Sequence, residues 1–292
     1  MSNRTLLDYT GHTPFLFLPR MSRLTGNDLH VKYDGTAMGG STQSRTGAAI
    51  LKQAMESGRL SPGNCVVEAC RPDMALALSQ ASTMLDLRLI VVMLSNTPRP
   101  VLNLIHAMGT EIVLSEADAG MKGARDKAEF IHHDIWNSFW PNIGRSDTAL
   151  KLHDALTGTE LVNDCLNNGV TPDIFLCCVD SGATITGAGS CLRRHFPDIG
   201  IVGVRCEAAH PGAEPALLPA GFADDIIDVS DDDMMRACRR LLKMEAVCGG
   251  PAAGACLHAV MALPADIRAE RRNIVMLFPD SGERYLHTNL FV

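Results

Sequence analysis

Residues 65–93, CVVEACRPDMALALSQASTMLDLRLIVVM, alternate between two patterns of apolar residues. Cys65–Ala69 and Leu89–Met93 are mostly apolar runs of strand length, whereas Asp73–Leu87 spaces its apolar side chains three and four residues apart. An amphipathic helix between two apolar strands is typical of a β-α-β unit, in which the two strands are parallel. The stretch therefore predicts an α/β protein with helices packed on parallel sheets.

The same alternation continues along most of the chain. Another helical pattern covers Thr46–Ser57. Further strand-like runs occur at Leu29–Tyr33, Glu111–Leu114, Ile174–Val179, Ile201–Val204 and Asn273–Phe278. The alternation pauses at residues 135–142, where aromatic and turn residues cluster, and again in the Pro/Gly/Ala-rich stretch 210–222. These pauses indicate two lobes.

Composition excludes several classes of protein. The 292 residues are 46% hydrophobic and 20% charged, with a formal net charge of -7, which argues against a broad nucleic-acid-binding surface. The longest apolar runs have the length of a strand, so no membrane span is expected, and the first residues lack a signal-peptide pattern. Ten cysteines without a C-x-x-C pair suggest reduced, buried thiols in a cytoplasmic protein, and no metal site is predicted.

Several short segments together resemble one enzyme family. They are GHTPF at 11–15, EIVL at 111–114, GMKGA at 120–124, HDALTGTE at 153–160, TITG at 184–187 and PDSGERYL at 279–286. They are similar to segments of the cysteine synthase (O-acetylserine sulfhydrylase) and cystathionine beta-synthase family. The resemblance implies a fold-type II scaffold for pyridoxal phosphate (PLP), with parallel-rich sheets flanked by helices. It also implies a larger lobe of residues 1–37 plus 143–292, a smaller inserted lobe of residues 38–142, and a homodimer.

The resemblance draws attention to Gln43. The segment AMGGSTQSR at 37–45 is similar to the family's N-P-x-G-S-x-K-D-R segment, whose lysine forms the Schiff base with PLP. Gln43 stands at the position of that lysine. A side-chain amide does not replace the amine, because its nitrogen lone pair is delocalised into the carbonyl. The chain is therefore expected to be a divergent member without the PLP lysine.

Other positions that contact the cofactor or substrate in the family also differ here. Cys70–Met74 replaces the loop T-S-G-N-T, which binds the substrate carboxylate, and Asp180–Thr184 replaces the phosphate loop G-T-G-G-T. Pro251 stands where a serine meets the pyridine nitrogen. The carboxylates of Asp73 and Asp180 would repel the anionic oxygens of the cofactor. These changes predict that the chain binds no PLP, and that the old cleft uses Gln43, Arg71, Ser181, Gly182, Thr184 and Pro251 for another ligand.

Two functions follow from this prediction. The chain is either a pseudoenzyme that serves as a scaffold or regulatory partner, or a repurposed PLP-independent biosynthetic enzyme. The pseudoenzyme would bind the C-terminus of a serine acetyltransferase-like protein or an active homologue. The enzyme would act on a small amino-acid-like or anionic metabolite, which Arg71 would bind. In that case Asp73 or Asp180 would transfer protons, and Cys70, at a helix N-terminus, would be a thiolate of lowered pKa.

Each of these residues also has a structural interpretation. Asp73 is equally suited to cap the helix that follows, and Cys70 to be a small buried residue at the end of a strand. Arg71 would then pair with Asp73 or Asp180. His210 and Glu214 lie in the loop that borders the family's cleft, where the alternative is a solvated loop.

Overall fold

The computed structural model describes residues 4–207, 209, 215–263 and 271–292. The chain separates into two compact units: unit 1 comprises the described residues up to Thr10 and Gln43–Ala149, and unit 2 those of Gly11–Thr42 and Leu150–Val292. The lobe limits predicted at 37/38 and 142/143 lie a few residues earlier. The N-terminal segment belongs to unit 1 because Leu7 is buried there, and its carbonyl accepts a hydrogen bond from Lys52 Nζ at 3.4 Å.

Unit 1 is built on a parallel three-stranded sheet in the order β3-β4-β5. Its strands are β3 (Cys65–Ala69), β4 (Arg88–Leu94) and β5 (Glu111–Ser115), and its helices are α2 (Gln43–Glu56), α3 (Pro72–Met84), α4 (Arg99–Ala107) and α5 (Gly120–Asp134). Ala124 and Ala128 of α5 pack with Val67 and Val92 of the sheet. All five residues of β3 are buried, and Cys65, Val67 and Ala69 pack in the apolar cluster with α5.

Unit 2 contains a six-stranded sheet in the order β1-β2-β9-β6-β7-β8. The strands are β1 (Phe15–Phe17), β2 (Asp28–Tyr33), β6 (Ile174–Cys178), β7 (Gly200–Arg205), β8 (Asp225–Asp228) and β9 (Asn273–Phe278). Every neighbouring pair is parallel except β1 with β2. β9 lies between β2 and β6, with Asp28 opposite Asn273 and Ile174 opposite Ile274.

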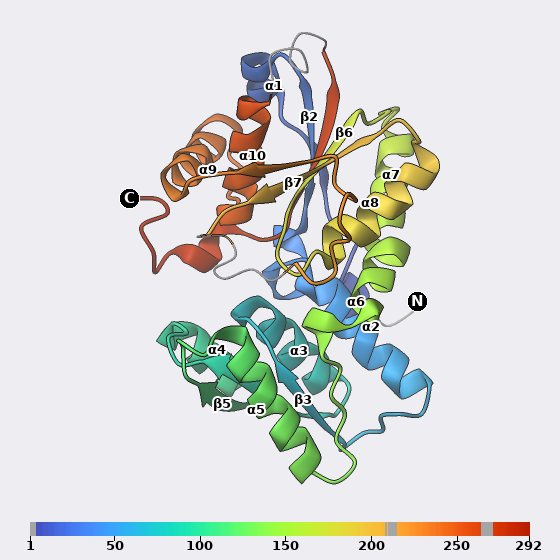
Figure 1. Cartoon of the computed structure of the whole chain (residues 1–292), viewed down its shortest axis with the longest axis vertical. Helices are drawn as coiled ribbons and strands as arrows, with labels where there is room; N and C mark the ends of the chain where they lie inside the picture. Colours follow the sequence, from blue (N-terminus) through green and yellow to red (C-terminus); the bar gives the residue numbers. More distant parts are fainter. Residues whose placement is uncertain (1–3, 208, 210–214, 264–270) are drawn as a thin grey trace. The chain divides into compact units, whose positions relative to one another are not determined.

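Helices cover both faces of the unit 2 sheet (Figure 1). They are α1 (Pro19–Thr25), α7 (Thr159–Asn167), α8 (Ala183–His195), α9 (Asp231–Glu245), α10 (Pro251–Ala262) and the π-helix η5 (His153–Gly158), while α6 (Asp147–Leu152) crosses the limit between the units. Short 3-10 helices are η1 (Leu6–Tyr9), η2 (Asp34–Thr36), η3 (Met38–Gly40), η4 (Ile143–Arg145) and η6 (Gly282–Tyr285). Leu176 of β6 packs with α9 and α10, whereas its neighbours Phe175 and Cys177 pack with α7 and α8. This is the alternation expected of a strand buried on both faces.

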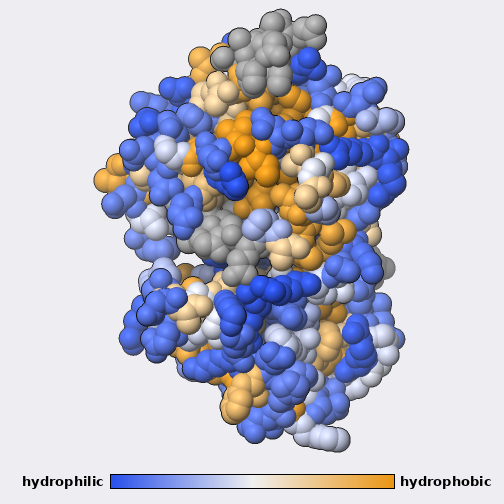
Figure 2. Space-filling view, viewed as in Figure 1, coloured by the Kyte–Doolittle hydropathy of each residue, from blue (hydrophilic) through white to orange (hydrophobic). Residues whose placement is uncertain are grey.

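The surface of unit 1 is mostly hydrophilic on the face drawn in Figure 2, with small groups of apolar residues between the polar ones. Its most exposed large apolar side chains include Phe130 and Trp136, at 72% and 96% exposure. In the described part of the chain, no helix combines the length and the apolar character needed to cross a bilayer.

Candidate functional site

Two helices of unit 2 begin at the carboxyl edge of its sheet. β6 ends at Cys178, and α8 starts five residues later at Ala183 on one face. α10 starts at Pro251 on the other face, where the carbonyl of Ala252 lies 3.7 Å from Cys178 Sγ. Parallel sheets bind ligands beyond the carboxyl ends of their strands, at points where the connections diverge to opposite faces. The edge formed by β6 and β9 is therefore the candidate site of unit 2.

The loop that leads into α8 has the geometry of an anion-binding turn. Gly182 has a φ of 89°, and a Cβ there would lie 2.6 Å from the backbone nitrogen of Leu218, so the position requires glycine. The N–H of Leu217 donates to the Ser181 carbonyl at 2.8 Å, and the Thr186 hydroxyl donates to the Leu217 carbonyl at 2.9 Å. The hydroxyls of Ser181 and Thr184 and the backbone amides of the first turn of α8 are suitable donors for a phosphate group.

A buried histidine lies behind this turn. His153, at 3% exposure, has its Nδ1 2.9 Å from Thr157 Oγ1 and its Nε2 3.2 Å from Thr184 Oγ1. All three residues belong to unit 2. Our sequence interpretation assigned no role to His153, although the HDALTGTE segment contains both it and Thr157.

The beginning of α10 is joined to the segment after β9. Gly249 and Ser281 form a β-bridge, and the Gly250 N–H donates to the Asp280 carbonyl at 3.3 Å. The Tyr285 hydroxyl donates to Asp280 Oδ2 at 2.5 Å, so the carboxylate is held beside Gly250, where a Cβ would lie 2.2 Å from Asp280 Oδ1. Pro251 is the first residue of α10, a position whose N–H has no partner within a helix. Its missing donor therefore does not weaken the helix.

Gln43 directly follows Thr42, the last residue of the first segment of unit 2. The Thr42 N–H donates to the Pro279 carbonyl at 2.7 Å, and Gln43 is the first residue of α2 in unit 1. One turn later, Gly47 packs on α3: a Cβ there would lie 3.3 Å from the sulfur of Met74. Because Met74 comes directly after Asp73, the beginnings of α2 and α3 lie near each other within unit 1.

The loop after β3 does not form the reactive thiolate that we predicted. Cys70 is 6% exposed, and burial raises the pKa of its thiol well above the ordinary value, with further increases from the nearby carboxyls of Glu68 and Asp73. The thiol is therefore protonated at neutral pH. Arg71 is the N-cap residue of α3, Pro72 its first residue and Asp73 its second, so the alternative of Asp73 as the N-cap is wrong. Its carboxylate still lies in the first turn, where the helix dipole favours negative charge.

A second buried carboxyl lies in β3 itself. Glu68 is 1% exposed and accepts a hydrogen bond from the Ile143 N–H at 3.1 Å. Burial raises the pKa of this carboxyl to about 8, although the Ile143 and Asn142 amides and the charge of Arg125 act in the opposite direction. We did not single it out from the sequence, although it is the only charged residue in the run CVVEA.

The two lysines nearest to Gln43 in the chain are held by other interactions. Lys32 is fully buried, and its ammonium lies 2.5 Å from Glu160 Oε1 and 2.7 Å from Asp164 Oδ2. Lys52 is half-buried, and it donates to the Leu7 carbonyl. A charged, hydrogen-bonded ammonium is not a nucleophile.

The predicted site residues thus form one group in each unit. Asp180, Ser181, Gly182, Thr184 and Pro251 lie at the carboxyl edge of unit 2, and Gln43, Cys70, Arg71 and Asp73 belong to unit 1. His210 and Glu214 lie outside the described residues. Within the described ranges, no group of three or more His, Cys, Asp or Glu residues is arranged to hold a metal ion.

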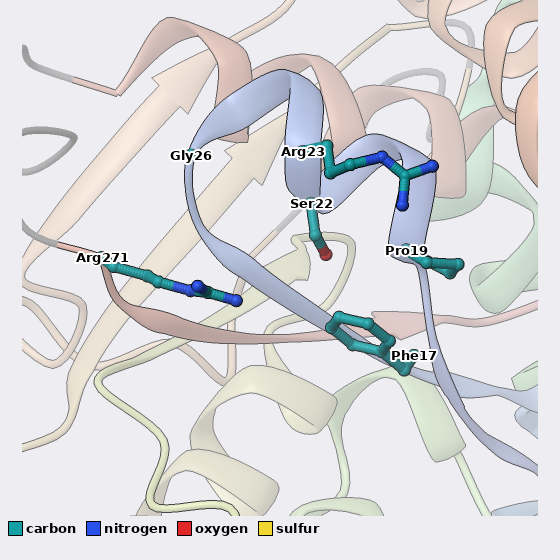
Figure 3. Close-up of a pocket in the computed structure, with 6 residues that line it drawn as sticks. All are labelled: Phe17, Pro19, Ser22, Arg23, Gly26 and Arg271. Carbon is teal, nitrogen blue, oxygen red and sulfur yellow. The ribbon is translucent and has the colours of Figure 1, made fainter.

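A separate cavity of about 270 Å³ lies at the amino end of β2 and β9 (Figure 3). Its lining comprises Phe17, Pro19, Ser22, Arg23, Gly26 and Arg271. Arg271 there forms a two-pronged ion pair with Asp28 at 2.6 and 2.8 Å. Since Asp28 is the first residue of β2, this cavity is at the opposite end of the sheet from the candidate site.

The chain is similar to known proteins over nearly its whole length. The model of the family "Pyridoxal-phosphate dependent enzyme" matches residues 6–280. Cysteine synthase of Staphylococcus aureus is 29% identical over 96% of this chain and 94% of its own length. The structure of O-ureido-L-serine synthase has a TM-score of 0.90 and 26% identity, over 100% of this chain and 95% of that one. A lysine-to-alanine mutant of that synthase with O-ureido-L-serine bound also has a TM-score of 0.90, with 26% identity over 100% of this chain and 94% of that one.

The family match contradicts our prediction that the chain has no cofactor. The proteins of this family depend on PLP, and the match covers most of the chain. The prediction rested on the missing amine at Gln43, the charges of Asp73 and Asp180 and the missing donor at Pro251, and it gave little weight to the donors that remain. In unit 2, the hydroxyls of Ser181 and Thr184 and the first-turn amides of α8 fit the phosphate of the cofactor.

Proposed function

Because the chain belongs to the pyridoxal-phosphate dependent enzyme family, we propose that it is a cysteine-synthase-like protein that holds PLP without a covalent bond and acts as a regulatory or scaffold partner. The observation that carries this proposal is Gln43, which begins α2 in a segment similar to the one that bears the family's lysine. Its carboxamide donates and accepts hydrogen bonds, but it provides no amine.

The cofactor, when bound, acts as an electron sink for charge that develops on an amino-acid substrate. In this chain Ser181, Thr184 and the amides at the beginning of α8 would hold its phosphate. Through its carboxamide, Gln43 would donate or accept a hydrogen bond and so orient a polar group of the bound ligand. It would neither form a covalent bond to the cofactor aldehyde nor take up a proton near neutral pH. Cysteine formation from O-acetylserine and sulfide is therefore expected to be absent.

The partner that we propose is a protein C-terminus, as in a serine acetyltransferase-like protein, or an active homologue that pairs with this chain as a dimer. Arg71, the N-cap residue of α3, supports the choice of a carboxylate, because a guanidinium binds this group through two parallel hydrogen bonds.

A second candidate function is catalysis on a small amino-acid-like metabolite. The comparison that favours it is the lysine-to-alanine mutant of O-ureido-L-serine synthase, which has O-ureido-L-serine bound. Binding of an amino acid thus survives the loss of a lysine in that protein. Asp73 or Asp180 would transfer the proton in this case.

The covalent state of the cofactor tests the proposal. The full chain, purified from cells supplied with vitamin B6, is divided: one part is denatured in acid to release PLP, and the other is reduced with borohydride, digested and examined by mass spectrometry. We expect released PLP close to one equivalent per chain and no pyridoxyl group on any lysine. The Gln43→Lys variant is expected to acquire a pyridoxyl group at residue 43.

Three outcomes would contradict the proposal. If the purified wild-type chain contains no PLP, the proposal that it holds this cofactor is wrong. A pyridoxyl group on Lys32 or Lys52 would show that one of these lysines binds PLP covalently. Turnover of O-acetylserine or O-ureido-L-serine by the wild-type chain would replace the partner role with the enzymatic one. Calorimetry with C-terminal peptides of serine acetyltransferase, matched against the same peptides with an amidated C-terminus, tests the partner directly.

A further inference from the structure

The π-helix η5 and the helix α8 pack unusually closely because glycines lie at their contacts. A Cβ at Gly187 of α8 would lie 2.4 Å from the Leu150 carbonyl oxygen and 2.8 Å from the Cβ of His153. A Cβ at Gly158 of the π-helix would lie 2.4 Å from the Cβ of Cys191. Side chains larger than hydrogen at either glycine would push the two helices apart. This close packing brings the His153 ring to the first turn of α8.

The hydrogen bonds of His153 form a chain that ends at this turn. Thr157, fully buried and one turn after His153, is 2.9 Å from Nδ1, and Thr184, half-buried, is 3.2 Å from Nε2. Thr184 is the second residue of α8, where its hydroxyl accompanies the backbone amides that have no partner within the helix. The imidazole therefore connects a buried threonine to one at the candidate site.

The direction of these hydrogen bonds decides whether the Thr184 hydroxyl acts as a donor or as an acceptor toward a ligand. A neutral imidazole has one donor and one acceptor nitrogen. If the Thr157 hydroxyl donates to Nδ1, the proton is on Nε2, which donates to Thr184 Oγ1, and the Thr184 proton stays available to a ligand. In the reverse direction the Thr184 hydroxyl donates its proton to Nε2, so only its oxygen lone pairs face the ligand. These lone pairs would repel an anion bound at the beginning of the helix.

We propose that His153 is a positioning residue for a phosphate group: fixed by Thr157 as the Nε2–H tautomer, it turns the Thr184 hydroxyl outward as a donor to the phosphate. This inference rests on the proposed function, in which that phosphate belongs to PLP. The ligand class is a phosphomonoester dianion, whose oxygens accept several hydrogen bonds at once.

Binding of PLP, compared with pyridoxal as the probe that lacks the phosphate, tests the role of each residue. The apo forms of the full-length wild type, Thr184→Val, Thr157→Val, His153→Leu and His153→Gln are titrated with both compounds by fluorescence. We expect Thr184→Val to bind PLP roughly 10-fold more weakly, and Thr157→Val and His153→Leu roughly 3- to 10-fold more weakly, as for loss of a hydrogen bond to a charged group. Affinity for pyridoxal should not change. His153→Gln, whose amide can donate near the former Nε2 position, should restore most of the affinity for PLP.

Two further measurements separate positioning from a general effect on folding. Thermal unfolding identifies variants that lose PLP because they unfold, and nitrogen NMR of the labelled wild type identifies the protonated imidazole nitrogen. Protonation of Nδ1, or weaker binding of pyridoxal and PLP by the same factor, would overturn the inference. If the wild type binds PLP and Thr157→Val and His153→Leu bind it equally well, only this inference fails. If the wild type binds no PLP, the proposed function fails and the inference with it.

Discussion

Glu68 Oε1 accepts a hydrogen bond from the backbone N–H of Ile143, whereas its Oε2 has no hydrogen-bond partner among the described residues. The contact attaches the start of η4 to β3, an edge strand of the unit 1 sheet. Burial raises the pKa of the Glu68 carboxyl from 4.5 to about 8, so the group is neutral through most of the physiological range. A neutral carboxyl avoids the large cost of a buried charge.

Glu68 predicts that the protein becomes less stable as the pH rises. Because the folded pKa is higher than the unfolded one, the stabilisation is complete below pH 4.5 and is lost as the pH rises toward 8. At ~1.4 kcal/mol per pKa unit, the loss is on the order of 5 kcal/mol. Glu68→Gln should raise the free energy of unfolding at pH 8 and change it little at pH 5. Urea unfolding of both proteins at each pH gives this difference, and equal pH profiles would rule the explanation out.

Lys32 should be essential for the stability of unit 2. Its ammonium is fully buried between the carboxylates of Glu160 and Asp164, and it donates to the Thr13 carbonyl at 2.7 Å. Lys32→Met leaves those carboxylates without their cation, and we expect the free energy of unfolding to fall by about 3–5 kcal/mol. The exposed Lys151 provides the control, since Lys151→Met should remain within ~0.5 kcal/mol of the wild type. Equal effects of the two substitutions in denaturant unfolding would contradict this view of Lys32.

Cysteine alkylation should distinguish Cys70 from Cys248. Both thiols have pKa values raised by burial, but Cys248 is half-buried and Cys70 is almost inaccessible. Because alkylation needs an accessible thiolate, iodoacetamide should modify Cys248 first and Cys70 only on unfolding. Peptide mass spectrometry over a time course measures the order. Modification of Cys70 in the folded protein at the faster rate would restore the reactive-thiol hypothesis.

Gly187 should tolerate no side chain. An alanine there would bring its Cβ to 2.4 Å from the Leu150 carbonyl oxygen, so the helices must separate, at a cost of about 1–3 kcal/mol or more. Gly144 has no neighbouring atom within 4 Å of the same point, so Gly144→Ala is the matched control. Thermal unfolding of both variants tests the contact. If Gly187→Ala unfolds at the same temperature as the wild type, α8 has room for a side chain beside the Leu150 carbonyl, and the prediction is wrong.

The sequence was most informative where strands are buried on both faces. Cys65–Ala69 and Asn273–Phe278 were predicted residue for residue, because runs of this length that are apolar at all but one position have few alternatives in an α/β protein. β1 and β8 were missed. β1 has only three residues, and β8 has an aspartate at each end, so neither edge strand shows a distinct pattern.

The candidate site was predicted only in part, for a physical reason. Segment motifs located Gln43, the turn at Gly182 and the loop after β3, since these depend on local sequence. The pKa of Cys70 and of Glu68 depends on burial by residues far along the chain, such as Ile143. The contact between His153 and Thr184 likewise needs two helices to meet. The cofactor prediction rested on the missing amine at Gln43, the charges of Asp73 and Asp180 and the missing donor at Pro251, and the family match contradicts it.

The position of β9 has a consequence for biosynthesis. This strand completes the unit 2 sheet by pairing with β2 on one side and β6 on the other, yet it follows both of them in the chain. While the ribosome is still translating, the β1-β2 pair and the β6-β7-β8 portion have no common neighbour and expose unpaired strand edges. Nascent chains of this protein must therefore wait, protected from aggregation, until residues 273–278 emerge from the exit tunnel.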